Sequence, residues 1–194
     1  MRDGEAAESQ RVIVELRQYT LRPGQWAALA GLFERALAEG QEAVGMTILG
    51  WFRDLDDPDR FVWLRSFPDL ARRTPALAAF YGGPVWAEHR EAANATMIDS
   101  ENVLLLSPAR GEAGFSLNRG AQVVVSIHQF PEPVDDDVVE RLERELGRAW
   151  ASLVTEESPN DFPALPVREG EHVVVRFSDR EDAGADEVLR LAPP

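Results

Sequence analysis

The segment from Val12 to Gly24 carries three side chains that could do chemistry, and they occupy alternate positions: Glu15, Arg17 and Tyr19. Residues with this spacing lie on one face of a β-strand, where they would bring together a carboxylate, a guanidinium and a phenol. A guanidinium in such a place can hold a carboxylate or stabilise an enolate. The segment therefore predicts a strand with one apolar face and one polar face that could bind an acidic or carbonyl-bearing molecule.

The same pattern returns in three later segments, FVWLRSF (61–67), QVVVSIHQF (122–130) and HVVVRF (172–177). In the first of them Trp63 and Arg65 share a face. The other two segments align with the two earlier strands, which places Ser126 over Glu15, His128 over Arg17, Phe130 over Tyr19 and Arg176 over Arg65. The sequence therefore predicts two related units whose polar faces carry side chains at matching positions.

These faces supply the candidate site residues. Imidazole titrates near neutral pH, so His128 is the side chain on them best suited to move a proton. The candidate catalytic residues are Glu15, Arg17 and His128, and the candidate substrate-binding residues are Tyr19, Trp63, Arg65, Arg176 and His89. His89 would share a helix face with Trp86, where a histidine is usually a packed, hydrogen-bonded core residue.

The elements that must position these residues follow the order β-α-β-β-α-β between residues 12 and 107, which is the ferredoxin-like split unit. After a polar leader (1–11) and this first unit comes a glycine-rich linker (108–120), and then a second unit (121–194). The second unit shows strands at 122–130, 151–155 and 173–177, and a short helix at 185–191. It therefore lacks a fourth strand and is incomplete.

Each unit should form a sheet with helices on one face, which the apolar strand residues would contact. The polar face would then meet another sheet, from the other unit or from a second chain. Two such sheets form a barrel, so we expect an α+β fold of tandem ferredoxin-like repeats forming a dimeric α/β-barrel, with a homodimer as the assembly.

Composition restricts the function classes. The formal charge of -14 argues against binding to nucleic acid or to an anionic membrane, and the absence of cysteine excludes disulfides and thiolate catalysis. No metal-binding motif is present, and the polar start of the chain with no long apolar run favours a cytoplasmic protein.

Three stretches of the sequence resemble the NIPSNAP family: ELRQYTLRPG (15–24), FYGGPVWAEHREAANATMIDSENVLLLS (80–107) and NDFPALPVREGE (160–171). The resemblance implies a tandem ferredoxin-like fold, within the dimeric α/β-barrel superfamily, and oligomeric assembly. It brings no agreed set of catalytic residues. Relatives in the wider superfamily include cofactor-free monooxygenases, cyclases or isomerases, and haem enzymes, while some NIPSNAP members are regarded as binding or scaffold proteins.

Three interpretations of the function are open at this point. In the first, the barrel interior binds a small hydrophobic molecule through Arg17, Arg65 and Arg176 while His128 moves a proton, without a cofactor. In the second, the barrel binds haem through His128, or through His89 or His172. In the third, the chain is an interaction or scaffold protein whose acidic surface and proline-rich loop (156–171) contact a partner and whose interior is filled by side chains. Arginines such as Arg17 could then pair with acids such as Glu15 to fix the packing of the sheets.

Overall fold

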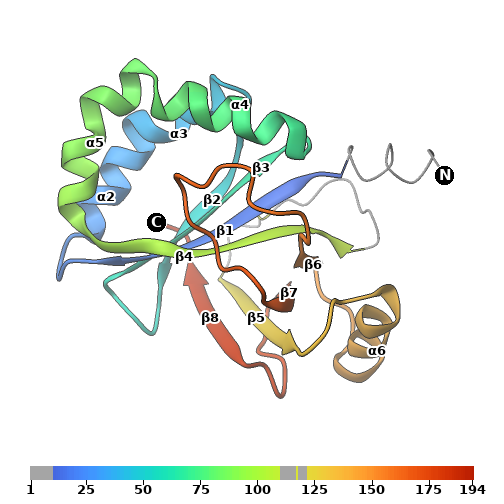
Figure 1. The fold of residues 1–194 in the computed structure, drawn as a ribbon. Coiled ribbons are helices and arrows are strands. Elements are labelled where there is room, and N and C mark those ends of the chain that lie inside the picture. Colours follow the sequence, from blue (N-terminus) through green and yellow to red (C-terminus); the bar gives the residue numbers. More distant parts are fainter. Residues whose placement is uncertain (1–10, 110–116, 118–121) are drawn as a thin grey trace.

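Eight strands close into one antiparallel barrel in the part of the chain that the computed structural model describes, residues 11–109, 117 and 122–194 (Figure 1). The strands are β1 (Ile13–Leu21), β2 (Thr47–Asp54), β3 (Arg60–Phe67), β4 (Met97–Pro108), β5 (Val123–Phe130), β6 (Ala151–Thr155), β7 (His172–Ser178) and β8 (Glu187–Ala192). Their order around the barrel is β1-β3-β2-β8-β5-β7-β6-β4. The expected mixture of helices and strands is confirmed. The expected leader and linker fall mostly outside the described residues.

The first half of the chain places its strands in the order β4-β1-β3-β2. Helical segments gather on its outer face (Figure 1), namely α2 (Trp26–Leu32), the π-helix η1 (Phe33–Leu37), α3 (Ala38–Glu42), α4 (Leu70–Tyr81) and α5 (Pro84–Thr96). Asp69 caps α4 by accepting a hydrogen bond from the backbone N–H of Arg72 at 2.9 Å. Pro84 opens α5, where a missing N–H costs nothing.

The second half places its strands in the order β8-β5-β7-β6, which repeats the order of the first half. One helix, α6 (Asp136–Leu146), covers its outer face with Val139 and Leu142. The prediction of a helix at 185–191 and of a missing fourth strand is wrong. Residues 187–192 form β8. Their short apolar pattern fits a helix or a strand, and pairing with the free edge that β5 would otherwise have, together with burial of Leu189 and Leu191 in the interior, favours the strand.

The two halves meet at two short junctions, which close the barrel within one chain. Arg53 and Asp54 of β2 pair with Ala192 and Leu191 of β8 at one junction. Residues 106–108 of β4 pair with residues 153–155 of β6 at the other. Of the two sources left open for the covering sheet, the other unit or a second chain, the structure uses the other unit. A homodimer stays a prediction, and it is not needed to complete the sheet.

The strands turn their apolar face into the barrel and their polar face outward, which is the reverse of the sequence prediction. One apolar cluster gathers residues from all eight strands and fills the barrel interior, among them Leu16, Leu64, Val125 and Val175. The interior of an eight-stranded barrel is narrow enough for its own side chains to fill, and apolar side chains fill it without unpaired polar groups. Glu15 and Arg17 lie on the outer face, between the sheet and the helices. The expectation that these charges line the interior is wrong, because the helices and loops supply their partners.

Among the described residues, no helix combines the length and the apolar character that crossing a membrane requires.

Candidate functional site

A cavity of about 340 Å³ lies between the outer face of the first half and its helices. Its floor comes from β1 and β3, its walls from the helices, and its cover from Phe162, Ala164 and Leu165 of the long loop that joins β6 to β7. Most of the lining is apolar or aromatic: Leu29, Phe33, Leu37, Phe61, Trp63, Phe80, Tyr81, Trp86, Ala93 and Met97. Polar groups on it come from Arg17, Tyr19, Gln41, Asn94 and Ser100, and from the hydroxyl of Tyr81. A cavity of this size and character suits a small hydrophobic molecule.

The helical wall of this cavity includes the π-helix η1. Phe33 and Leu37 stand at the two ends of that segment, and both line the cavity. The ring of Phe33 meets the ring of Trp63 edge to face, with centroids 4.9 Å apart. π-Helical turns are rare and occur often at functional sites, so this irregularity on the cavity wall supports the cavity as a candidate site.

Arg17 is the positively charged side chain on the cavity wall. It is buried, with 2% of its surface exposed. Its Nε donates a hydrogen bond to the hydroxyl of Tyr19 at 2.8 Å, and its Nη1 donates to Oε2 of Glu15 at 2.6 Å. Its guanidinium carbon lies 5.4 Å and 5.5 Å from the ring centroids of Tyr19 and Trp63. The neighbouring β-strand residues therefore fix the guanidinium in one orientation.

Glu15 shares the outer strand face with Arg17 and forms ion pairs with three arginines. Besides Arg17, its carboxylate accepts from Nε of Arg65 at 2.8 Å and from Nε of Arg73 at 2.9 Å. Burial by itself would raise the pKa of Glu15, but the charges of Arg65, Arg17 and Arg73 hold that pKa well below its usual range. Glu15 is therefore a permanent carboxylate that organises the arginines.

Tyr19 presents its hydroxyl beside Arg17. Burial raises the pKa of this phenol above its usual value, so the neutral form is retained. Because the hydroxyl oxygen accepts the hydrogen bond from Arg17 Nε, its own proton is left to donate to another group. Tyr19 and Arg17 together can offer an O–H and an N–H donor to an oxygen atom in the cavity.

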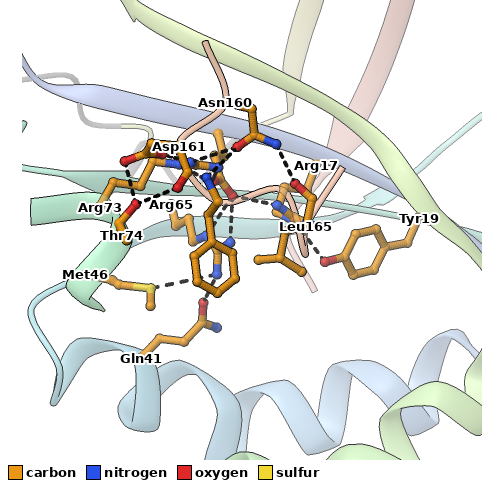
Figure 2. Close-up of polar contacts among 12 residues, drawn as sticks. Arg17, Tyr19, Gln41, Met46, Arg65, Arg73, Thr74, Asn160, Asp161 and Leu165 are labelled. Atoms are coloured by element: carbon orange, nitrogen blue, oxygen red, sulfur yellow. Dashed lines mark hydrogen bonds and ion pairs between the residues drawn. The ribbon is translucent and has the colours of Figure 1, made fainter. Parts of the chain in front are cut away.

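Arg73 of α4 connects this cluster to the loop that covers the cavity. Its Nη1 donates to Asn160 at 3.1 Å and also pairs with Asp161 (Figure 2). Thr74 donates to Oδ2 of Asp161 at 2.6 Å. The loop is thereby fixed to α4 next to the residues that cover the cavity.

The second half carries a separate polar cluster on its outer face. Oδ2 of Asp182 lies 3.2 Å from Nε2 of His128 and accepts from Nε of Arg176 at 2.6 Å. The backbone N–H of Asp182 donates to Ser126 at 3.0 Å. None of these side chains lines the cavity of the first half.

The sequence-predicted residues therefore divide into groups. Arg17, Tyr19 and Trp63 line the cavity, and Glu15 and Arg65 lie behind them. His128 and Arg176 belong to the other cluster, and His89 is half-buried on α5 away from the lining. The structure does not bring His128 together with Arg17.

A haem in this cavity would find no imidazole ligand, because none of the three histidines of the chain lines it. The described residues also contain no group of three or more His, Cys, Asp or Glu side chains that could hold a metal ion.

Sequence reasoning missed Arg73 and the loop residues Asn160, Asp161 and Phe162. The signal for Arg73 was present, since it precedes Ala76, Leu77 and Phe80 at helical spacing and so lies on an apolar face. A charged residue on such a face needs a buried partner, and Glu15 is that partner.

A family model described as NIPSNAP matches residues 14–110, which is half of the chain. The chain belongs to the NIPSNAP family. The match runs from β1 to the end of β4, so it contains the floor and helical walls of the cavity. The loop of the second half that covers the cavity lies outside the NIPSNAP match. No protein among the curated sequences matches.

Solved structures similar to this NIPSNAP protein cover about half of it. A NIPSNAP-like domain protein from Burkholderia xenovorans is 27% identical, with a TM-score of 0.49, over 54% of this chain and 91% of that chain. A NIPSNAP family protein from Agrobacterium tumefaciens is 22% identical, with a TM-score of 0.48, over 53% and 93%. A putative antibiotic biosynthesis monooxygenase from Chloroflexus aurantiacus is 17% identical, with a TM-score of 0.40, over 53% and 97%.

Proposed function

We propose that this NIPSNAP protein binds a small hydrophobic molecule with an acidic or carbonyl group in the cavity between β1, β3 and the helices of the first half. The observation that carries this proposal is Arg17, a buried guanidinium on the wall of an otherwise largely aromatic cavity. Burying a charge costs free energy unless it has partners, and a ligand oxygen is a suitable additional partner.

Arg17 and Tyr19 form a pair of donors that would orient the ligand. An acid or carbonyl oxygen that contacts both would place the rest of the molecule against Trp63, Phe33 and the other aromatic side chains. The same pair could stabilise negative charge that develops on an oxygen during a reaction. This arrangement replaces the expected site inside the barrel, since the interior is filled.

The residues that line the cavity limit the chemistry that this protein alone could perform. No Asp, Glu, His or Lys is among the described lining residues, so the cavity offers no ordinary general base. The arrangement favours binding, or a reaction in which the substrate or a second reactant accepts the proton, over acid and base catalysis by His128.

We further propose that the two halves are tandem ferredoxin-like units of which only the first binds the ligand. The shared strand order supports this relation. The single helix on the second half supports the division of roles, since a wall like that of α4 and α5 is not found there among the described residues.

Isothermal titration calorimetry with 2-acetonaphthone, a neutral hydrophobic ketone, tests the binding site. Ala93 lines the cavity from α5, so Ala93→Leu should fill part of it and weaken binding about tenfold. Ala87→Leu, an exposed position on the same helix, should bind as the unchanged protein does. Equal binding by all three proteins would place the ligand elsewhere and contradict the proposal.

A further inference from the structure

The buried cluster behind the cavity holds more positive than negative charge. Arg17, Arg65, Arg73 and Glu15 are each at most 2% exposed. Asp161 is the other carboxylate that contacts them, and it is 27% exposed. No further carboxylate lies within 4 Å of these arginines among the described residues. Three guanidinium groups therefore face two carboxylates, which leaves one unmatched positive charge.

The second half provides an internal comparison. Ser126 pairs with Arg176 across β5 and β7 in the register in which Glu15 pairs with Arg65 across β1 and β3. There one guanidinium, Arg176, meets one carboxylate, Asp182, at 2.6 Å. The one guanidinium of this cluster is therefore matched by one carboxylate, and the excess of guanidinium groups over carboxylates is particular to the half that has the cavity.

The unmatched charge can be assigned to Arg17. Arg65 donates to Glu15 and Gln41, and Arg73 donates to Glu15, Asn160 and Asp161. Arg17 and Arg65 each contact one carboxylate, that of Glu15, so the number of carboxylates alone does not separate them. The Nη2 atoms of Arg65 and Arg73 lie 2.7 Å and 2.8 Å from Glu15, whereas Nη2 of Arg17 has no hydrogen-bond partner among the described residues. Arg17 is also the arginine of this cluster that lines the cavity.

We propose that the cavity selects ligands with a single ionised carboxylate, which accepts hydrogen bonds from Arg17 and Tyr19. This inference rests on the function proposed above and narrows the ligand from acids and carbonyl compounds to hydrophobic monocarboxylates. One negative charge neutralises the cluster. A neutral ligand leaves the guanidinium unmatched, and a second carboxylate would lie unpaired against aromatic side chains at a cost in free energy.

Three ligands with the same aromatic body test the charge preference: 2-naphthoate, 2-naphthamide and naphthalene-2,6-dicarboxylate. Calorimetric titration of the full chain at pH 7 should give a dissociation constant for 2-naphthoate at least about tenfold below those of the amide and the dicarboxylate. Equal binding of 2-naphthoate and 2-naphthamide would overturn the charge inference and leave the proposed function standing. If neither 2-acetonaphthone nor any of the three other ligands binds, both the charge inference and the proposed function are overturned.

Two variants shift the charge count in opposite directions. Arg17→Met should abolish the preference for 2-naphthoate over the amide, whereas Arg141→Met, an exposed change on α6, should leave it unaltered. Asp161→Asn removes one negative charge and should widen the preference about threefold or more. This second variant tests the inference even where Arg17→Met fails to fold. An unchanged preference in both variants would contradict the assignment of the charge to this cluster.

Discussion

At the scale of single residues, Glu15 determines the geometry of the site without touching the cavity. Its carboxylate holds Arg17, Arg65 and Arg73 at contacts between 2.6 and 2.9 Å. Three side chains of like charge would repel one another in a buried place without it. The position of Arg17 in the cavity therefore depends on a residue that no ligand would contact.

Glu15→Gln should destabilise the protein by about 3 kcal/mol or more, because it leaves buried guanidinium groups without their shared carboxylate. Since the folded-state pKa of Glu15 is depressed from 4.5, its contribution is present above that value and is lost as the pH falls below it. Urea unfolding between pH 3 and pH 7 should thus show a weaker pH dependence in Glu15→Gln, whereas the exposed Glu88→Gln should behave like the unchanged protein.

Tyr19 gives a second prediction at this scale, because the chain has two tyrosines. In Tyr81→Phe, the tyrosinate absorbance of the folded protein reports on Tyr19 alone and should rise only above pH 10, as burial favours the neutral phenol. The same variant unfolded in urea should titrate near pH 10. Tyr19 then contributes stability that is lost as the pH rises through its folded-state pKa. Matching folded and unfolded titrations would contradict the burial of this phenol.

The sequence alone located Glu15, Arg17 and Tyr19 on one strand face, because a period of two is a local property of the chain. The prediction that this face points into the barrel interior is wrong, since it points towards the helices. That choice depends on partners distant in sequence, such as Gln41, Arg73 and Asp161, which reach Glu15 or its arginines only after the helices and the loop have packed.

At the scale of elements, the loop that joins β6 to β7 covers the cavity. It carries Phe162 and Leu165 over the opening and is fixed to α4 through Asp161, which contacts Arg73 and Thr74. Asp161→Ala should therefore raise the amide hydrogen-exchange rates of residues 157–165, while Asp179→Ala, an exposed change after β7, should not. Unaltered exchange in Asp161→Ala would show that other contacts hold the loop.

Elements with strong local signals could be predicted from the sequence, and β8 could not. Asp69 caps α4 and Pro84 opens α5, and both are residue types that favour a helix start. Residues 187–192 have apolar side chains at 188, 189, 191 and 192, a pattern too short to separate a strand from a helix. The cavity could not be predicted either, since helices of the first half and a loop of the second half form it together.

At the scale of the whole molecule, each half depends on the other for its edges and for the cover of its apolar face. In a fragment of residues 11–109, β2 would lack β8 and β4 would lack β6. The fragment would also expose Leu16, Val62 and Leu64. We expect this fragment to self-associate or aggregate, with a mass by size exclusion and light scattering of at least twice its own. A fragment that stays monomeric and unfolds cooperatively would contradict this view. The same measurement on the full chain tests the predicted homodimer.

The place of β8 also has a consequence for synthesis. Both of its neighbours, β2 and β5, precede it in the chain, and it completes the barrel by pairing with each of them. While the ribosome adds the earlier strands, the apolar residues of the future interior have no complete enclosure. The nascent chain therefore exposes apolar residues and unpaired strand edges until residues 187–192 leave the exit tunnel. During that interval, these surfaces favour aggregation with neighbouring chains.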